Sequence, residues 1–298
     1  MSKPALRAYI AWIAICIIWG TTYLAIRIGV ADLPPMLFAG LRWIAAGIIL
    51  VSIQKLLGNK FPQRNEIKHL AVVGIALIGV ANGLVVVAEQ WIPSGLTALL
   101  ITTLPFWMVG FESLLPEGQK FNRYIFFGLV IGLTGVFLIF SKDLQQWING
   151  NYLLGVLALM GAVISWSLGS IYSKYKKTSA HPMMGASIQM LIAGVLQTLL
   201  GLILGEHNSF HLTQNGFWAI AYLVIFGSIF GYASYIYAIH HLPLSFVSTY
   251  AYINPIIALI LGWYFLNEEL SYNILIAAVL IFIGVTFVKK GNTLRTPG

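Results

Sequence analysis

Long apolar segments alternate with short polar segments along this chain. Apolar runs of about twenty residues are separated by short joins that hold proline, glycine, asparagine and charged side chains. A helix of about 20 apolar residues is long enough to cross the hydrocarbon core of a bilayer. The pattern predicts ten such helices, at 8–30, 35–57, 67–89, 94–115, 122–140, 152–173, 183–205, 216–239, 243–266 and 271–289.

The composition fits one class of protein. Hydrophobic residues make up 59% of the 298 positions and charged residues 9%, whereas a soluble domain carries about 25% charged residues. Such a chain cannot cover its own surface in water, and its apolar content also excludes disorder. We therefore expect an all-α integral membrane protein surrounded by the lipid bilayer.

The distribution of positive charge sets the expected orientation. The formal net charge is +8, but no basic cluster has the spacing of a nucleic-acid site, so no nucleic acid partner is expected. With the N-terminus in the cytoplasm, Lys142 is the only Lys or Arg in the expected outer segments. Cytoplasmic loops carry the excess of Lys and Arg in membrane proteins, which places both termini in the cytoplasm. The first apolar run, 8–30, exceeds the core of about 7–15 residues in a signal peptide, so we expect it to remain as a spanning helix.

The chain also repeats itself. The matches are Trp19 with Trp166, Pro35 with Pro182 and Gly47 with Gly194 at a spacing of 147 residues, and Pro105 with Pro255 at a spacing of 150. We therefore expect two repeats, residues 1–146 and 147–298, with five helices each. Because five is odd, the second repeat would cross the bilayer in the opposite sense. Transporters with such inverted repeats bind their substrate near mid-membrane between the repeats and open to each side in turn.

Several short motifs resemble those of one family. Residues 18–23 read Ile-Trp-Gly-Thr-Thr-Tyr, residues 40–43 read Gly-Leu-Arg-Trp, and residues 165–170 read Ser-Trp-Ser-Leu-Gly-Ser. Asn254-Pro255 is followed by Leu-Asn-Glu-Glu-Leu at 266–270. In this order the motifs resemble the signatures of EamA-type members of the drug/metabolite transporter superfamily.

The resemblance extends over nearly the whole chain. It is strongest toward the YedA-type branch, through residues 80–83, 88–90 and 93–95. It implies a ten-helix secondary transporter of the bacterial inner membrane with two inverted five-helix repeats. The expected function is export of small metabolites, amino acids or amphipathic drugs by alternating access.

Other functions are less well supported by the residues. The same fold could instead carry a lipid-linked intermediate, which stays the alternative. A membrane-embedded enzyme is less favoured, because no His-Glu-x-x-His or Gly-x-Ser-x-Gly motif is present. We expect no enzymatic activity, no cofactor and no metal site. The expected partner is a small-molecule substrate, and the sequence leaves a homodimer open.

Polar and aromatic side chains within the spans are the candidates for a substrate cavity. Rings with polar tips suit an amphipathic or aromatic solute, although the core of a membrane protein also uses them for packing. The candidate cavity residues are Trp19, Thr22, Tyr23, Asn82, Trp166, Ser170, Tyr232, Tyr235, Tyr252 and Asn254.

The ionisable candidates for a functional role within or at the end of the predicted spans are Arg27, Arg42 and Glu89. A charged side chain at the centre of a spanning helix costs about 2.5–3.5 kcal/mol on insertion scales, so it needs a partner. We predict that Glu89 pairs with Arg42 or Arg27, and that the group serves as a gate or in proton coupling. A static ion pair, or an arginine that reaches the membrane interface, is the alternative.

Pro105 and Pro255 fall in the middle of corresponding spans of the two repeats. Proline removes a backbone hydrogen bond and clashes with the preceding turn. We therefore predict a kink at each position that frees a carbonyl group toward the central cavity. A fixed kink that only shapes the packing is the alternative.

Overall fold

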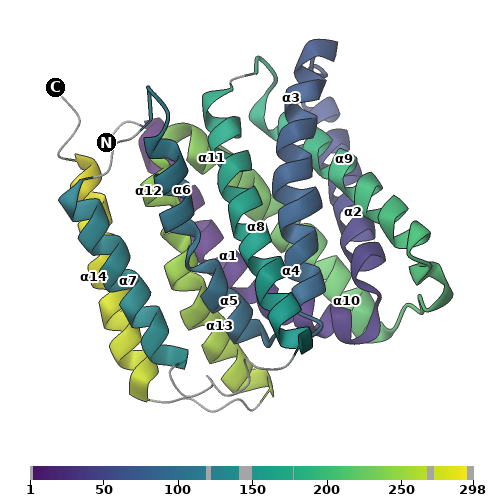
Figure 1. Ribbon diagram of the computed structural model, residues 1–298. Helices are drawn as coiled ribbons and strands as arrows, with labels where there is room; N and C mark the ends of the chain where they lie inside the picture. The colour runs from purple at the N-terminus through teal and green to yellow at the C-terminus, as the bar shows by residue number, and fades with distance from the viewer. Residues whose placement is uncertain (1–2, 119–121, 141–149, 177, 267–271, 294–298) are drawn as a thin grey trace.

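The computed structural model describes residues 3–118, 122–140, 150–176, 178–266 and 272–293, and all regular structure within these ranges is helical (Figure 1). The first part of the chain forms α1 (Lys3–Asp32), α2 (Pro35–Leu56), α3 (Arg64–Gly74), η1 (Ile75–Asn82), α4 (Gly83–Ala88), α5 (Ser94–Ile101), α6 (Leu104–Ser113) and α7 (Arg123–Phe140). The second part forms α8 (Gly150–Tyr175), α9 (Pro182–Ile203), η3 (Glu206–Asn208), α10 (Gln214–Tyr222), η4 (Leu223–Tyr232), α11 (Ala233–His241), α12 (Leu244–Val247), α13 (Tyr250–Leu266) and α14 (Tyr272–Thr293).

Seven helices among the described residues are long and apolar enough to cross a membrane. They span Leu6–Asp32, Pro35–Leu56, Arg64–Ala88, Gly150–Tyr175, Pro182–Ile203, Gln214–His241 and Leu244–Phe265. The three other predicted spans correspond to α5 with α6, to α7 and to α14. The structure thus confirms an all-helical membrane architecture, while the number of ten crossings stays a prediction.

Two of the spanning helices contain a π-helical segment. Arg64–Ala88 widens into η1 in its second half, and Gln214–His241 widens into η4. π-Helical turns are rare and often mark functional sites, because the extra residue per turn redirects the side chains that follow. The two segments lie at corresponding places in the predicted repeats.

Two other spans are interrupted. The chain leaves the helix at Thr102 and Thr103, and α6 then begins at Leu104, so that Pro105 lies in the first turn where its missing N–H costs nothing. In the corresponding part of the second half, the interruption is at Ser248 and Thr249. Pro255 lies within α13, which is helical from Tyr250 to Leu266.

The helices of the two halves are interleaved. α2 packs along α9 and α7 packs along α14, at opposite sides of the molecule (Figure 1). Between these pairs, α1 contacts α13, η4 and α11, while α8 contacts α6, η1 and α4. Corresponding helices of the two predicted repeats therefore contact corresponding partners.

Small residues permit the closest of these contacts. A Cβ on Gly47 of α2 would lie 2.7 Å from the Leu191 side chain of α9, and a Cβ on Gly194 of α9 would lie 2.7 Å from the Ile44 backbone of α2. Small residues of this kind let helix backbones approach closely in a membrane. The two contacts are equivalent in the repeats, because a shift of 147 residues takes Ile44 and Gly47 to Leu191 and Gly194.

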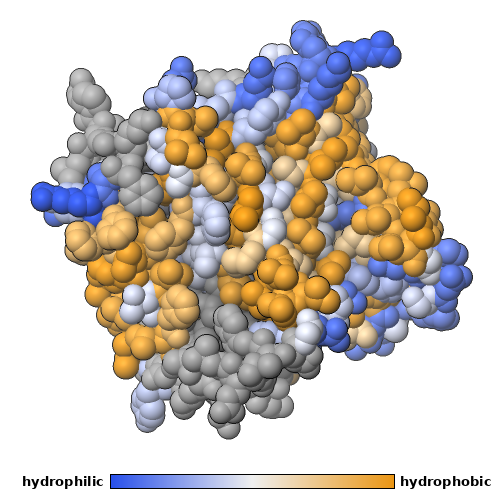
Figure 2. Space-filling model, in the orientation of Figure 1, coloured by the Kyte–Doolittle hydropathy of each residue, from blue (hydrophilic) through white to orange (hydrophobic). Residues whose placement is uncertain are grey.

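The outer surface suits a lipid environment. Large apolar side chains such as Ile48, Leu157 and Leu199 are each more than half exposed. Figure 2 shows apolar residues over the middle of the molecule and hydrophilic residues gathered at its edges. α1 begins and α14 ends at the same end of the helix bundle (Figure 1). We call this the terminal end and the opposite one the distal end.

The contact between α7 and α14 gives a test of the packing. A methyl group on Gly128 of α7 would lie 2.7 Å from the carbonyl oxygen of Gly284 in α14, and such overpacking costs about 1–3 kcal/mol. Gly128→Ala is therefore expected to lower the melting temperature of the detergent-purified protein, followed by tryptophan fluorescence.

Gly110→Ala is the matched control, because a Cβ on Gly110 meets no atom within 4 Å. Its melting temperature should stay the same or rise, since alanine favours a helix over glycine by about 1 kcal/mol. Equal stability of the two variants would contradict the close contact of α7 with α14.

Candidate functional site: the central cavity

A cavity of about 80 Å³ lies at the centre of the bundle. The cavity is lined by Trp19, Thr22, Tyr23, Ile26, Arg42, Trp43, Ala81, Asn82, Val85, Ile101, Leu104, Ala162, Val163, Trp166 and Tyr250. These residues come from both predicted repeats.

The aromatic wall of the cavity is formed by Trp19, Trp166 and Tyr250, and the ring of Tyr235 packs behind them. The ring of Trp19 lies 5.3 Å from that of Trp166, 5.1 Å from that of Tyr235 and 5.0 Å from that of Tyr250. Offset and edge-to-face arrangements at such distances stabilise aromatic clusters. The two tryptophans, which occupy equivalent positions in the predicted repeats, therefore meet at the centre of the molecule.

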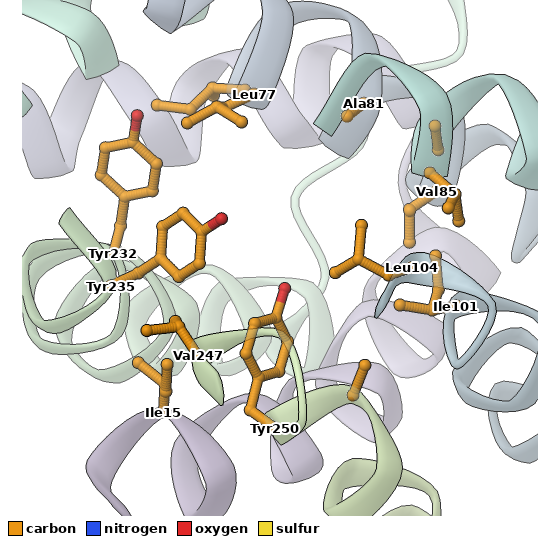
Figure 3. Packing of buried hydrophobic residues seen from close by; sticks show 14 of the residues in the cluster. Ile15, Leu77, Ala81, Val85, Ile101, Leu104, Tyr232, Tyr235, Val247 and Tyr250 are labelled. Carbon is orange, nitrogen blue, oxygen red and sulfur yellow. The ribbon is translucent and has the colours of Figure 1, made fainter. Parts of the chain in front are cut away.

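Hydrogen bonds hold these rings in place. The Trp19 Nε1–H donates to the carbonyl oxygen of Gly227 at 3.1 Å, and the Trp166 Nε1–H donates to the Tyr235 hydroxyl at 2.9 Å. The Tyr235 hydroxyl also bonds to Ser170 Oγ at 2.5 Å. Figure 3 shows the rings of Tyr235 and Tyr250 on one side, with Val85 and Leu104 on the other.

Arg42 supplies a buried positive charge in the lining. Its side chain is 3% exposed, and its Nε donates to Ser228 Oγ of η4 at 2.9 Å. The guanidinium carbon lies 4.4 Å from the centre of the Trp43 ring, a cation–π distance. The Trp43 Nε1–H in turn donates to Asn82 Oδ1 at 2.8 Å. The Nη1 of Arg42 has no hydrogen-bond partner among the described residues.

The predicted ion pair of Glu89 is not formed. Arg27 uses its Nη1 to donate to the backbone carbonyl of Glu89 rather than to the carboxylate. Both carboxylate oxygens of Glu89 are buried without a hydrogen-bond partner among the described residues. Arg27 and Arg42 nevertheless act on this carboxylate electrostatically. The prediction failed because the sequence does not show whether Arg27 meets the carboxylate of Glu89 or its backbone carbonyl.

The structure separates the predicted cavity residues into two groups. Trp19, Thr22, Tyr23, Asn82 and Trp166 line the cavity. The remaining candidates lie behind the lining: Ser170, Tyr232, Tyr235, Tyr252 and Asn254.

Each residue of the second group supports a neighbouring helix. The Tyr232 hydroxyl donates to Gln189 Oε1 of α9 at 2.7 Å, and the Tyr252 hydroxyl donates to the carbonyl of Leu129 in α7 at 3.3 Å. The side-chain amide of Asn254 is placed to donate to the Cys16 carbonyl of α1 at 2.9 Å. These contacts hold the lining helices in position.

Sequence reasoning did not assign Trp43 and Tyr250 to the cavity, and both line it. Trp43 directly follows Arg42, so its proximity to a predicted residue was the available signal. The helix interruption at Ser248 and Thr249 sets the direction of α13, on which Tyr250 faces the cavity and Tyr252 packs toward α7. The regular repeat of a helix could not predict which of these two tyrosines faces the cavity.

A polar contact joins the predicted halves near the terminal end. Glu112 Oε1 of α6 lies 3.7 Å from Lys174 Nζ of α8 and accepts a hydrogen bond from the Tyr175 hydroxyl at 2.8 Å. Lys174 Nζ also donates to the carbonyl of Leu242 at 3.3 Å. Glu112 is fully buried. No pattern in the sequence singles out Lys174 as the partner of Glu112.

Polar contacts also join the halves at the distal end. The carboxylate of Glu206 accepts hydrogen bonds from the backbone N–H groups of Met36 at 3.2 Å and Leu37 at 2.8 Å. These N–H groups belong to the first turn of α2, which favours a negative charge. The Thr213 hydroxyl donates to Asp32 Oδ2 at 2.7 Å.

A family model matches the chain twice. The EamA-like transporter family matches residues 6–141 and again residues 153–289. The chain belongs to the EamA-like transporter family. This EamA-like chain is thus a membrane transporter, as the sequence motifs predicted.

Curated relatives agree with this assignment. The inner membrane transporter YedA of Escherichia coli (strain K12) is 37% identical over 293 residues, covering 98% of this chain and 94% of that protein. The transporter YoaV of Bacillus subtilis (strain 168) is 27% identical over 283 residues, covering 92% and 93%. A crystal structure at 18% identity superimposes with a TM-score of 0.78 over 97% of this chain and 99% of that one. At that identity, the likeness concerns the fold alone.

The hydroxyl of Tyr235 gives a test of the aromatic wall. Tyr235→Phe leaves the Trp166 Nε1–H without its acceptor, which costs about 1–2 kcal/mol in a buried site. We expect a clear fall in the melting temperature of the purified protein.

Tyr252→Phe is the control, since it removes one hydrogen bond of 3.3 Å. Its fall in melting temperature should be smaller. If the two variants lose the same stability, the Tyr235 hydroxyl does not hold the wall as described.

Proposed function

We propose that this protein is a secondary transporter of the bacterial inner membrane that exports small metabolites, amino acids or amphipathic drugs by alternating access. The observation that carries the proposal is the central cavity, which is lined by helices from both halves of the chain. Substrate sites between repeats are the common arrangement in transporters. The inner membrane location is supported by the similarity to the inner membrane transporter YedA.

We propose further that residues 1–146 and 147–298 are inverted five-helix repeats with both termini in the cytoplasm. The two separate matches to the family model support the duplication. The interleaved contacts support a two-fold relation between the halves, because α1 meets α13 and η4 as α8 meets α6 and η1. The terminal end would then face the cytoplasm.

In this proposal the polar contacts at the two ends are the gates. The contact of Glu112 with Lys174 and Tyr175 lies between the cavity and the terminal end, together with the aromatic wall. The contact of Glu206 with the start of α2 lies at the distal end. Opening toward one side requires that the contact on that side break while the other stays intact.

Glu89 is the proposed proton-coupling group. Its carboxylate is fully buried, has no hydrogen-bond partner among the described residues and lies within electrostatic reach of Arg27 and Arg42. A carboxylate in this position responds to movement of either arginine by changing its preference for a proton. The helix interruptions near Pro105 and Ser248 provide flexible points beside the same cavity.

Alternating access is tested by labelling a cavity residue from each side. Cys16 is the single cysteine of the chain, so Cys16→Ala provides a background for Val163→Cys in the cavity lining. A membrane-impermeant maleimide should modify this cysteine in both right-side-out and inside-out vesicles. Ala46→Cys, at a position fully buried between helices, is the control that should stay unmodified.

Glu112→Gln in the Val163→Cys background tests the gate. Losing the charge contact with Lys174, worth about 1 kcal/mol, should speed modification from the cytoplasmic side by about three- to tenfold. Modification from one side only, unaltered by Glu112→Gln, would contradict alternating access.

A further inference from the structure

The cavity carries chemistry that narrows the class of substrate. We propose that Arg42 binds the carboxylate of a small amphipathic anion whose apolar or aromatic body lies against Trp19, Trp166 and Tyr250. This inference rests on the proposed transport function and specifies the ligand of the same cavity.

The charge of Arg42 forms no direct ion pair with a described residue, and the carboxylate of Glu89 acts on it only from beyond salt-bridge distance. Its guanidinium is 3% exposed and lines the cavity. The Nε is bound to Ser228, but Nη1 has no partner among the described residues. A buried charge without a partner is costly. Arginine prefers a carboxylate held by two parallel hydrogen bonds, so an anionic ligand supplies the missing partner.

Asn82 adds a second donor to the same lining. Its Oδ1 accepts the hydrogen bond from Trp43, which orients the side-chain amide. The NH₂ group of this amide then makes no hydrogen bond to another described residue. None of the described residues that line the cavity is Asp or Glu. The polar part of the lining therefore offers donors and positive charge, which favours an anion over a cation.

The rest of the lining suits an apolar body. Trp19, Trp166 and Tyr250 line the cavity together with the apolar Val85 and Leu104, and Figure 3 shows Tyr250 across from Val85 and Leu104. Arg42 lies about two turns into α2, which begins at the distal end. A bound anion would therefore point its carboxylate toward the distal half and its apolar body toward the aromatic wall.

Three probes of matched size test the head group: 3-phenylpropionate, 3-phenylpropionamide and 3-phenylpropylamine. Binding to the detergent-purified protein is measured by isothermal titration calorimetry. The carboxylate is expected to bind at least tenfold more tightly than the neutral amide, and the amine to bind most weakly.

Two arginine variants then locate the interaction. Arg42→Gln should abolish the preference for the carboxylate over the amide. Arg123→Gln is the control, because Arg123 is an exposed arginine of α7 that does not line the cavity; it should retain the preference. Arg42→Lys keeps the charge and loses the forked geometry, and should weaken carboxylate binding on the order of tenfold. This variant carries the test if Arg42→Gln does not fold.

Equal binding of carboxylate and amide, equal effects of Arg42→Gln and Arg123→Gln, or no binding of any probe would overturn the inference. The maleimide experiment on Val163→Cys needs no ligand. A protein that passes it and fails here is therefore a transporter for another class of substrate.

Discussion

Within the hydrocarbon core there is no water to satisfy a polar group, so each polar side chain of this protein must find a partner in its own helix or in another one. Ser167 and Ser187 bond to carbonyls of their own helices, whereas other side chains bond across helices. Ser165 donates to the Ala76 carbonyl, Gln197 donates to the Ile78 carbonyl, and Tyr232 donates to Gln189. The first two bonds cross between the halves and fix how the helices interleave. Among the described residues, the charged side chains with an unsatisfied buried atom are Arg42, Glu89 and Glu112.

These three charges divide the molecule along its axis. Glu112 lies near the terminal end in contact with Lys174, Arg42 lines the cavity, and Glu89 lies toward the distal end beside Arg27. A buried charge that lacks a hydrogen-bond partner is stabilised only by the present arrangement of the groups around it. Such groups respond to a ligand, a proton or a helix movement, whereas the glycine contacts of α2 with α9 and of α7 with α14 do not. In our account, the outer helix pairs are the fixed frame and the central helices move between them.

The sequence predicted the helices well where proline and apolar length decide the boundaries. α2 begins at Pro35 and α9 at Pro182, within one residue of the starts of the predicted spans 35–57 and 183–205. The π-helical segments η1 and η4 were not predicted, because they depend on how neighbouring helices pack. The interruption at Ser248 was missed for the same reason. A kink was predicted at Pro255 instead, and Pro255 lies within α13.

The candidate site was predicted in part. Trp19 and Trp166 were visible as a repeated pair, and both line the cavity. Tyr232 and Tyr252 were chosen for their hydroxyl groups, but those hydroxyls bond to α9 and α7. Residue type shows which side chains need a partner, whereas only the fold decides whether the partner is a substrate or another helix.

The central claim is that one cavity opens alternately at the two ends of the bundle. Pulsed electron paramagnetic resonance in the Cys16→Ala background measures it most directly, with spin labels replacing the exposed residues Leu114 and Lys176 at the terminal end, or Gln90 and Ser209 at the distal end. The account predicts two distance populations at each end, with any condition that lengthens one distance shortening the other. A single fixed distance at both ends, or distances that lengthen together, would contradict it.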